Sequence, residues 1–163
     1  MGSNVPGNLL VLQDELVAHL KAELADIRPA VHILKPSDLA SKTDIKGNAT
    51  IAQPTPAVNV VLMGMRPSTD PSKQRTDGRA MLIQQLFVAE VVTRNVASLK
   101  DGAAARNDAG ELAMRVLLAL MATKLPSATG VLKIPPGVGP VYQGGMQYLP
   151  ISIETTLLVE KKS

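Results

Sequence analysis

The sequence predicts an α+β domain, with a mostly antiparallel sheet of four to five strands flanked by two main helices. Two segments have helical periodicity, and a long central run is apolar on both faces of a predicted strand. The last segment alternates apolar with polar residues. The 163 residues are close to the size of one domain, so we expect a single unit over 1–163. With 45% apolar and 19% charged residues, the chain can bury a core, which excludes wholesale disorder.

The first predicted helix covers residues 9 to about 25. We expect Asn8 to be its N-cap, because an asparagine side chain accepts a backbone N–H well at that position. Pro29 stops the helix, and residues 30–35 predict a short strand that ends at Pro36. Leucines spaced three or four residues apart predict one buried stripe: Leu9, Leu12, Leu16, Leu20 and Leu24.

Residues 37–56 have little periodicity and predict a long flexible arm without regular structure. A loop of about twenty residues is uncommon in a compact domain and is usually functional or disordered. Lys42 and Lys46 are balanced by Asp38 and Asp44. We therefore expect an arm that is ordered by a partner rather than a nucleic-acid tail.

Two strands follow the arm, over residues 57–65 and 81–94. The second has apolar residues on both faces, which predicts a central strand covered on both sides. It is also long, since about 5 to 6 residues are typical, and we expect its end to extend past the core toward a partner.

The loop between these strands, at about 66–79, is rich in turn residues and cations. Cations in a loop can contact phosphate groups without reading bases, so the loop is the candidate contact with DNA or with an acidic partner. The alternative is an ordinary solvated loop. The candidate residues are Arg66, Lys73, Arg75 and Arg79.

The second predicted helix begins at Asp108, where Asp108 and Glu111 resemble a capping box, or a turn earlier near Ala103. Pro126 closes it. One apolar stripe contains Leu112, Val116 and Leu120, and a second contains Met114, Leu118, Met121 and Leu125. A single sheet covers only one side of such a helix, so the second stripe is the candidate oligomer interface. The alternative is that both stripes belong to the core.

The C-terminal part predicts a hairpin. Residues 131–134 predict a short strand, Gly144-Gly145 is a turn signal, and the strand from Met146 onward alternates. Pro150 places that strand, or its first part, at a sheet edge. The inward positions are Leu149, Ile151, Ile153, Leu157 and Val159, and the outward positions are Ser152, Glu154, Thr156 and Glu160.

The composition and motifs argue against an enzyme, and we expect no catalytic residue, no cofactor and no metal site. There are no cysteines and two histidines, which removes disulfides, zinc fingers and a three-histidine site. His19 and His32 have no neighbouring acid that suggests a catalytic dyad, so we expect surface or structural roles for both. Phe87, Tyr142 and Tyr148 are too few for a base-stacking platform. A small hydrolase or nucleotide-binding enzyme remains an alternative without a motif.

No membrane role is expected. The longest apolar stretch, 116–122, is far shorter than the roughly 20 residues needed to cross a bilayer. The first residues have no export or lipid signal, so we expect a soluble protein made in a reducing compartment.

The chain resembles the tail terminator (tail completion) proteins of long-tailed bacteriophages, including those of Mu-like phages, over roughly residues 9–160. The resemblance rests on the strand at 88–96, on Asp108-Ala109-Gly110-Glu111-Leu112, and on the ending. In that ending Tyr142, Gly144-Gly145, Tyr148 and Pro150 lead into the alternating strand. Few aromatic residues and the long arm depart from the family pattern.

The resemblance implies a small virion subunit, assembled in the host cytoplasm, that forms a hexameric ring on the head-proximal end of the tail tube. Such a ring stops tube growth and provides a docking surface for the head-completion (neck) protein. Its partners would be other copies of the chain, the tail tube protein, the neck protein, and DNA passing through the lumen without sequence specificity. The alternative within virion assembly is a head-completion or baseplate ring protein.

Overall fold

The computed structural model describes residues 7–39, 41–43, 49–51, 53–68, 78–94, 102–143 and 145–161. Their elements, in chain order, are α1 (Val11–Glu23), β1 (His32–Leu34), a 3-10 helix η1 (Pro36–Asp38), β2 (Ser41–Thr43), β3 (Ala49–Ile51), β4 (Ala57–Pro67), β5 (Ala80–Arg94), α2 (Gly102–Leu120), β6 (Val141–Gln143) and β7 (Met146–Glu160).

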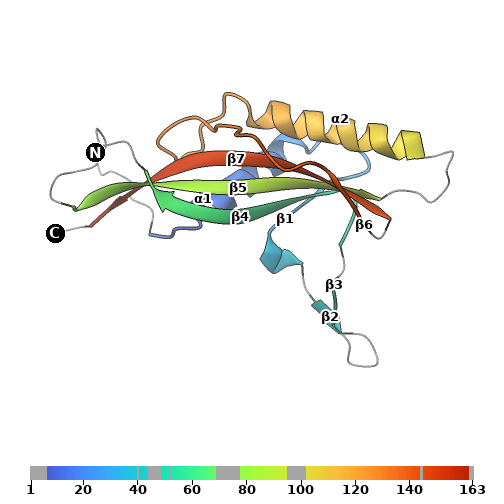
Figure 1. Cartoon of the computed structure of the whole chain (residues 1–163), viewed down its shortest axis with the longest axis horizontal. Helices are drawn as coiled ribbons and strands as arrows, with labels where there is room; N and C mark the ends of the chain where they lie inside the picture. The colour runs from blue at the N-terminus through green and yellow to red at the C-terminus, as the bar shows by residue number, and fades with distance from the viewer. Residues whose placement is uncertain are drawn as a thin grey trace.

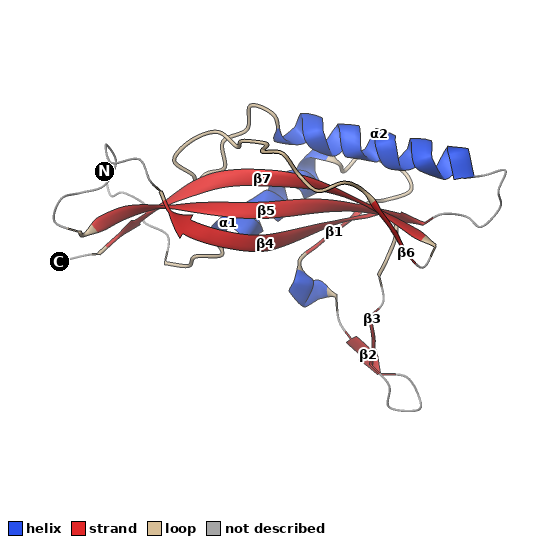
Figure 2. Ribbon diagram, in the orientation of Figure 1, coloured by secondary structure: helices blue, strands red, loops and turns tan. Residues whose placement is uncertain are grey.

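Five strands form the main sheet in the order β1-β4-β5-β7-β6, and β2 and β3 form a separate pair (Figure 1). Among the described strands of this sheet, β1 and β4 pair in parallel and the other neighbours pair antiparallel. The long strands β4, β5 and β7 lie side by side, with α1 and α2 packed against them (Figure 2). The predicted α+β class is therefore confirmed.

The core lies between the two helices and one face of the sheet. Burial of one leucine or valine side chain contributes about 1.5–3 kcal/mol, so this layer is the main source of stability. Its largest fully buried residues include Leu12, Leu16 and Leu20 of α1, Leu120 of α2, Val58, Val60, Phe87, Val91, Ile153 and Leu157 of the sheet, and Leu125.

The start of α1 differs from the prediction by two residues. Leu10, not Asn8, occupies the N-cap position, and it makes no side-chain cap. The Asn8 side-chain oxygen instead accepts the Leu10 N–H at 2.9 Å. Leu9 precedes the helix and is exposed, so it does not join the buried leucine stripe.

The central position predicted for the 81–94 segment is confirmed, because β5 pairs with β4 on one side and β7 on the other. Its coverage on both faces is confirmed only in part. Phe87 and Val91 face the helices and are buried. On the other face Leu82 and Val92 are also buried, whereas Leu86 is 38% exposed. Both α-helices pack on one side, so neither of the described α-helices lies on the opposite face of β4, β5 and β7, which we call the helix-free face.

The helix α2 starts at Gly102, which agrees with the earlier of the two predicted starts. Asp108 and Glu111 are therefore exposed residues inside the helix, and the capping-box interpretation is wrong. The helix ends at Leu120, six residues before Pro126, because Ala122 has a left-handed φ of 54°. The Thr123 hydroxyl donates to the Ala119 carbonyl at 2.9 Å, which satisfies one of the last helical acceptors.

The arm contains regular structure, contrary to the prediction. η1 follows β1, and the antiparallel pair of β2 and β3 projects away from the main sheet (Figures 1 and 2). Residues 40, 44–48 and 52 of the arm lie outside the described residues. Ordering of the arm by a partner stays a prediction.

The predicted C-terminal hairpin is confirmed as β6 and β7, and Gly145 in their turn has a φ of 73°. Residues 131–134 do not form a strand; Ala128 and Lys133 make isolated bridges to Leu157 and Glu154 of β7. Ser152 lies on the helix-free face but is buried, because the chain at Gly137 passes so close that a Cβ there would lie 3.0 Å from Ser152 Oγ.

Candidate functional site

The outer side of α2 has a stripe of large apolar side chains. Met114, Leu118 and Met121 are 54%, 57% and 55% exposed, while Leu112, Val116 and Leu120 on the inner side are buried. The two stripes predicted from the sequence therefore lie on opposite sides, one in the core and one on the surface. We call Met114, Leu118 and Met121 the α2 stripe.

Leu125 does not belong to the α2 stripe. It is 1% exposed and packs in the core. The helical spacing that linked it to Met121 ends with the helix at Leu120, and the left-handed turn at Ala122 redirects the chain inward. The structure thus brings together three of the four residues predicted for the oligomer interface and removes the fourth.

Polar contacts hold α2 against α1. Arg115 Nη2 lies 2.7 Å from Asp26 Oδ1, and the Arg115 side chain also donates to the Glu23 carbonyl at 3.4 Å. The His19 ring nitrogen lies 2.7 Å from the Ala119 carbonyl, which agrees with the structural role expected for this histidine. These contacts join α2 to the end of α1, while burial of Leu112, Val116 and Leu120 in the core sets the direction in which the α2 stripe faces.

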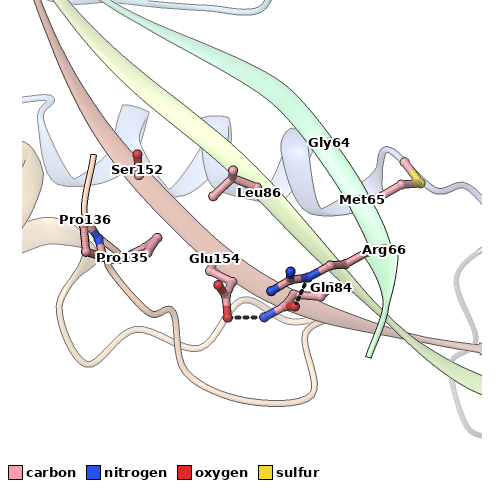
Figure 3. Close-up of a pocket in the computed structure, with 9 residues that line it drawn as sticks. All are labelled: Gly64, Met65, Arg66, Gln84, Leu86, Pro135, Pro136, Ser152 and Glu154. Carbon is pink, nitrogen blue, oxygen red and sulfur yellow. Dashed lines mark hydrogen bonds between the residues drawn. The ribbon is translucent and has the colours of Figure 1, made fainter. Parts of the chain in front are cut away.

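A second surface is a shallow cavity of about 340 Å³ on the helix-free face (Figure 3). A hydrogen-bonded chain crosses it: Arg66 Nε donates to Gln84 Oε1 at 2.8 Å, and the Gln84 amide donates to Glu154. The lining residues are Gly64, Met65, Arg66, Gln84, Leu86, Pro135, Pro136, Ser152 and Glu154.

Sequence reasoning selected Arg66 but missed Gln84 and Glu154. These polar residues lie on different strands, and the β5–β7 register brings them together. Leu86 pairs with Glu154, so Gln84, two residues from Leu86 along β5, is diagonally opposite Glu154. A usable signal was present, since Gln84 and Gln85 interrupt the apolar run between Met81 and Ala89.

The candidate basic residues are only partly described. Arg66 lies near the end of β4 and Arg79 immediately before β5, where the Arg79 carbonyl accepts the Lys161 N–H at 2.7 Å. The Ser68 N–H donates to the Leu82 carbonyl, so the two strand ends lie side by side. Lys73 and Arg75 lie outside the described residues.

Among the described residues, no group of three or more histidine and acidic side chains could hold a metal ion. In the same part of the chain, no helix is both long and apolar enough to cross a membrane.

A family model described as phage tail terminator protein matches residues 12–162, almost the whole chain. The chain belongs to this family. No curated protein matches the sequence. The resemblance seen in the sequence is thereby confirmed, and this tail terminator is a structural component of a phage tail that interacts with other components of the virion. The family is not a known class of enzyme.

Proposed function

We propose that this tail terminator forms a hexameric ring on the head-proximal end of the tail tube, where it stops tube polymerisation and provides the docking surface for the neck. It acts as a structural part, without catalysis, and joins the virion in the host cytoplasm. The observation that supports self-assembly is the α2 stripe, because three neighbouring large apolar side chains remain more than half exposed on one copy. Apolar patches of this kind are typical of protein interfaces.

A ring requires a heterologous interface, in which one surface of each copy contacts a different surface of the next. The α2 stripe supplies one of these two surfaces. Complete burial of a Met or Leu side chain contributes about 1.5–3 kcal/mol, so three half-exposed side chains contribute roughly 3 kcal/mol per contact.

That gain is smaller than the cost of association, which is about 4–15 kcal/mol or more. The α2 stripe alone therefore does not hold two copies together. We infer that further contacts between copies, or the end of the tube as a template, complete the assembly. Ring formation on the tube rather than in free solution would let the ring act as a stop signal.

We further propose that Arg66, Lys73, Arg75 and Arg79 face the lumen or an axial surface of the ring. There they would contact DNA phosphates without sequence specificity, or an acidic surface of a neighbouring tail protein. The end of β4, which carries Arg66, lies beside the start of β5, which Arg79 precedes, so these two cations lie at the two ends of one loop, which supports a shared contact surface.

The ring proposal is tested by deleting the protein and measuring tail lengths by electron microscopy. We expect tails of irregular or excess length, because nothing would stop tube growth. Tails of normal length would overturn the proposed stop function. Co-purification with the tube protein, rather than only with the portal, would separate this role from that of a head-completion protein.

A further inference from the structure

The outer edge of β4 is largely uncovered. β1 pairs only with Ala57–Asn59 at the start of β4, whereas β4 continues to Pro67. Among the described residues, no other strand pairs with this edge. Uncovered strand edges present backbone N–H and C=O groups that readily accept another strand.

Several features narrow the usable part of this edge. The Val60 carbonyl accepts the Gln13 side-chain amide at 2.9 Å, so α1 already satisfies the first acceptor beyond β1. A register shift between Leu62 and Gly64 interrupts the strand, and Pro67 has no N–H. The remaining window is the three residues 64–66, all exposed, and we call it the β4 window.

The direction of the backbone groups in the β4 window follows from the pairing with β5. Ser68 donates its N–H to Leu82 at 2.7 Å, so Ser68 faces β5. Directions alternate along a strand, which places Gly64 and Arg66 toward β5 and the N–H and C=O of Met65 outward. Met65 is also 43% exposed and Met63 is 60% exposed, so apolar surface borders this outward amide.

Among the described residues, the hairpin of β2 and β3 pairs with no strand of the main sheet. Each of its strands has three residues, and the two pair with each other as a sheet separate from the main one. An isolated two-stranded hairpin is at best marginally stable in water. It arises beside the start of β4 and projects away from the sheet (Figure 1), whereas the β4 window begins seven residues along the strand, about 23 Å away.

We propose that the β2–β3 hairpin of one copy pairs with the β4 window of a second copy. The three-residue strands match the three-residue window in length, and main-chain hydrogen bonds at Met65 provide the register. The contact is heterologous, because hairpin and window are different surfaces, so repetition can close a ring. The bulge and Pro67 restrict the edge to a short strand, which prevents open-ended sheet growth.

This inference rests on the proposed ring and names contacts that the α2 stripe does not provide. The chain has no cysteine, so each introduced thiol is the only one in its copy and cross-links only at the chosen position. Lys42 and Thr50 are direct partners in the hairpin, so one of them is near the β4 window whichever hairpin strand pairs with it.

The experiment mixes a tagged copy carrying Met65→Cys with an untagged copy carrying Lys42→Cys or Thr50→Cys, in the presence of tail tubes, and adds a short bis-maleimide. We expect cross-linked dimers of tagged with untagged chain in at least one mixture. The matched control, Val141→Cys in place of Met65→Cys, presents a thiol at a 49% exposed site on β6, on the far side of β5 and β7 from β4, and should give at least tenfold less product.

The outcomes separate the two proposals. Rings on the tube without the hairpin–window cross-link overturn this contact and leave the ring standing. Copies that remain monomeric on the tube overturn both. Cross-linking of Met65→Cys with itself, and not with the hairpin, would show two β4 edges pairing with each other and would also overturn the contact.

A backbone variant gives an independent readout. Met65→Pro removes the one outward N–H of the β4 window, and proline is tolerated where the N–H of an edge strand faces solvent. We expect it to fold, with an unfolding midpoint close to that of Met65→Ala, and to lose ring assembly at least tenfold. Met65→Ala keeps the N–H and should keep assembly; equal assembly of both variants would contradict the proposal.

Discussion

Arg115 of α2 contacts Asp26, just beyond α1, at 2.7 Å, and thereby joins two helices that are far apart in the sequence. The hydrogen bond from Arg115 lowers the pKa of Asp26 below its ordinary value of 3.8. Both side chains are substantially exposed, so solvent screens the pair and its effect on stability is small.

This contact predicts a specific pH dependence. Because the pKa of Asp26 is lowered in the folded state, its stabilising effect is present above pH 3.8 and is lost as the pH falls through the lower, folded value. Asp26→Asn should therefore unfold slightly more easily than the parent at neutral pH, with the difference vanishing in strong acid. Urea unfolding across the pH range checks this, and a difference that persists in strong acid would argue against the assignment.

The α2 stripe predicts an assembly defect without a folding defect. Leu118→Glu places a charge on a side chain that is 57% exposed, so the free energy of unfolding should change by no more than about 0.5 kcal/mol. Burial of that charge between copies should abolish ring assembly. Val131→Glu, at a site that is 55% exposed, is the matched control and should assemble normally. Assembly by Leu118→Glu, measured by native mass spectrometry on tube ends, would remove the α2 stripe from the interface.

Leu125 and Met121 should respond in opposite ways to truncation. Leu125→Ala leaves a cavity in the core and should cost about 2–5 kcal/mol of unfolding free energy. Met121→Ala removes a 55% exposed side chain and should stay within about 0.5 kcal/mol of the parent, while weakening assembly. Thermal and denaturant unfolding measure the change in unfolding free energy of each variant. Similar losses of stability in the two variants would mean that Met121 belongs to the core.

The cations of the 66–79 loop predict a defect in joining. Replacement of Arg66, Lys73, Arg75 and Arg79 by Gln removes four positive charges and should reduce head joining or infectivity, with tail length unchanged. Electron microscopy and plaque counts check the two parts separately. Full infectivity of the fourfold variant would count against contact with DNA or an acidic partner.

Periodicity predicted the secondary structure well wherever a segment was long. The leucine spacing located α1, and the alternation around Ile151 and Ile153 located β7 with the correct buried face. Prediction failed at ends, because caps and terminations depend on local backbone geometry. Asn8 lies before the N-cap and accepts the N–H of the N-cap residue Leu10, rather than capping the helix itself. The left-handed backbone at Ala122 ends α2 before the expected proline.

The candidate surfaces were predictable only in part. The stripe of Met114 and Leu118 follows from helical spacing alone. The buried position of Leu125 depends on the path of the chain after α2. The chain from Arg66 through Gln84 to Glu154 joins three strands, and its members meet only through strand register. Spacing along one segment contains no information about such contacts.

The amino-acid order by itself determined the α+β class, the central place of β5, the absence of cysteine chemistry and the resemblance to tail terminators. These depend on composition and on periodicity within single segments. The tertiary structure decided that both helices pack on one face of the sheet. It also decided that one apolar stripe of α2 is buried and the other exposed, and that β4 extends beyond the end of β1. Those features depend on how segments far apart in the chain cover one another, and burial is a property of the packed whole.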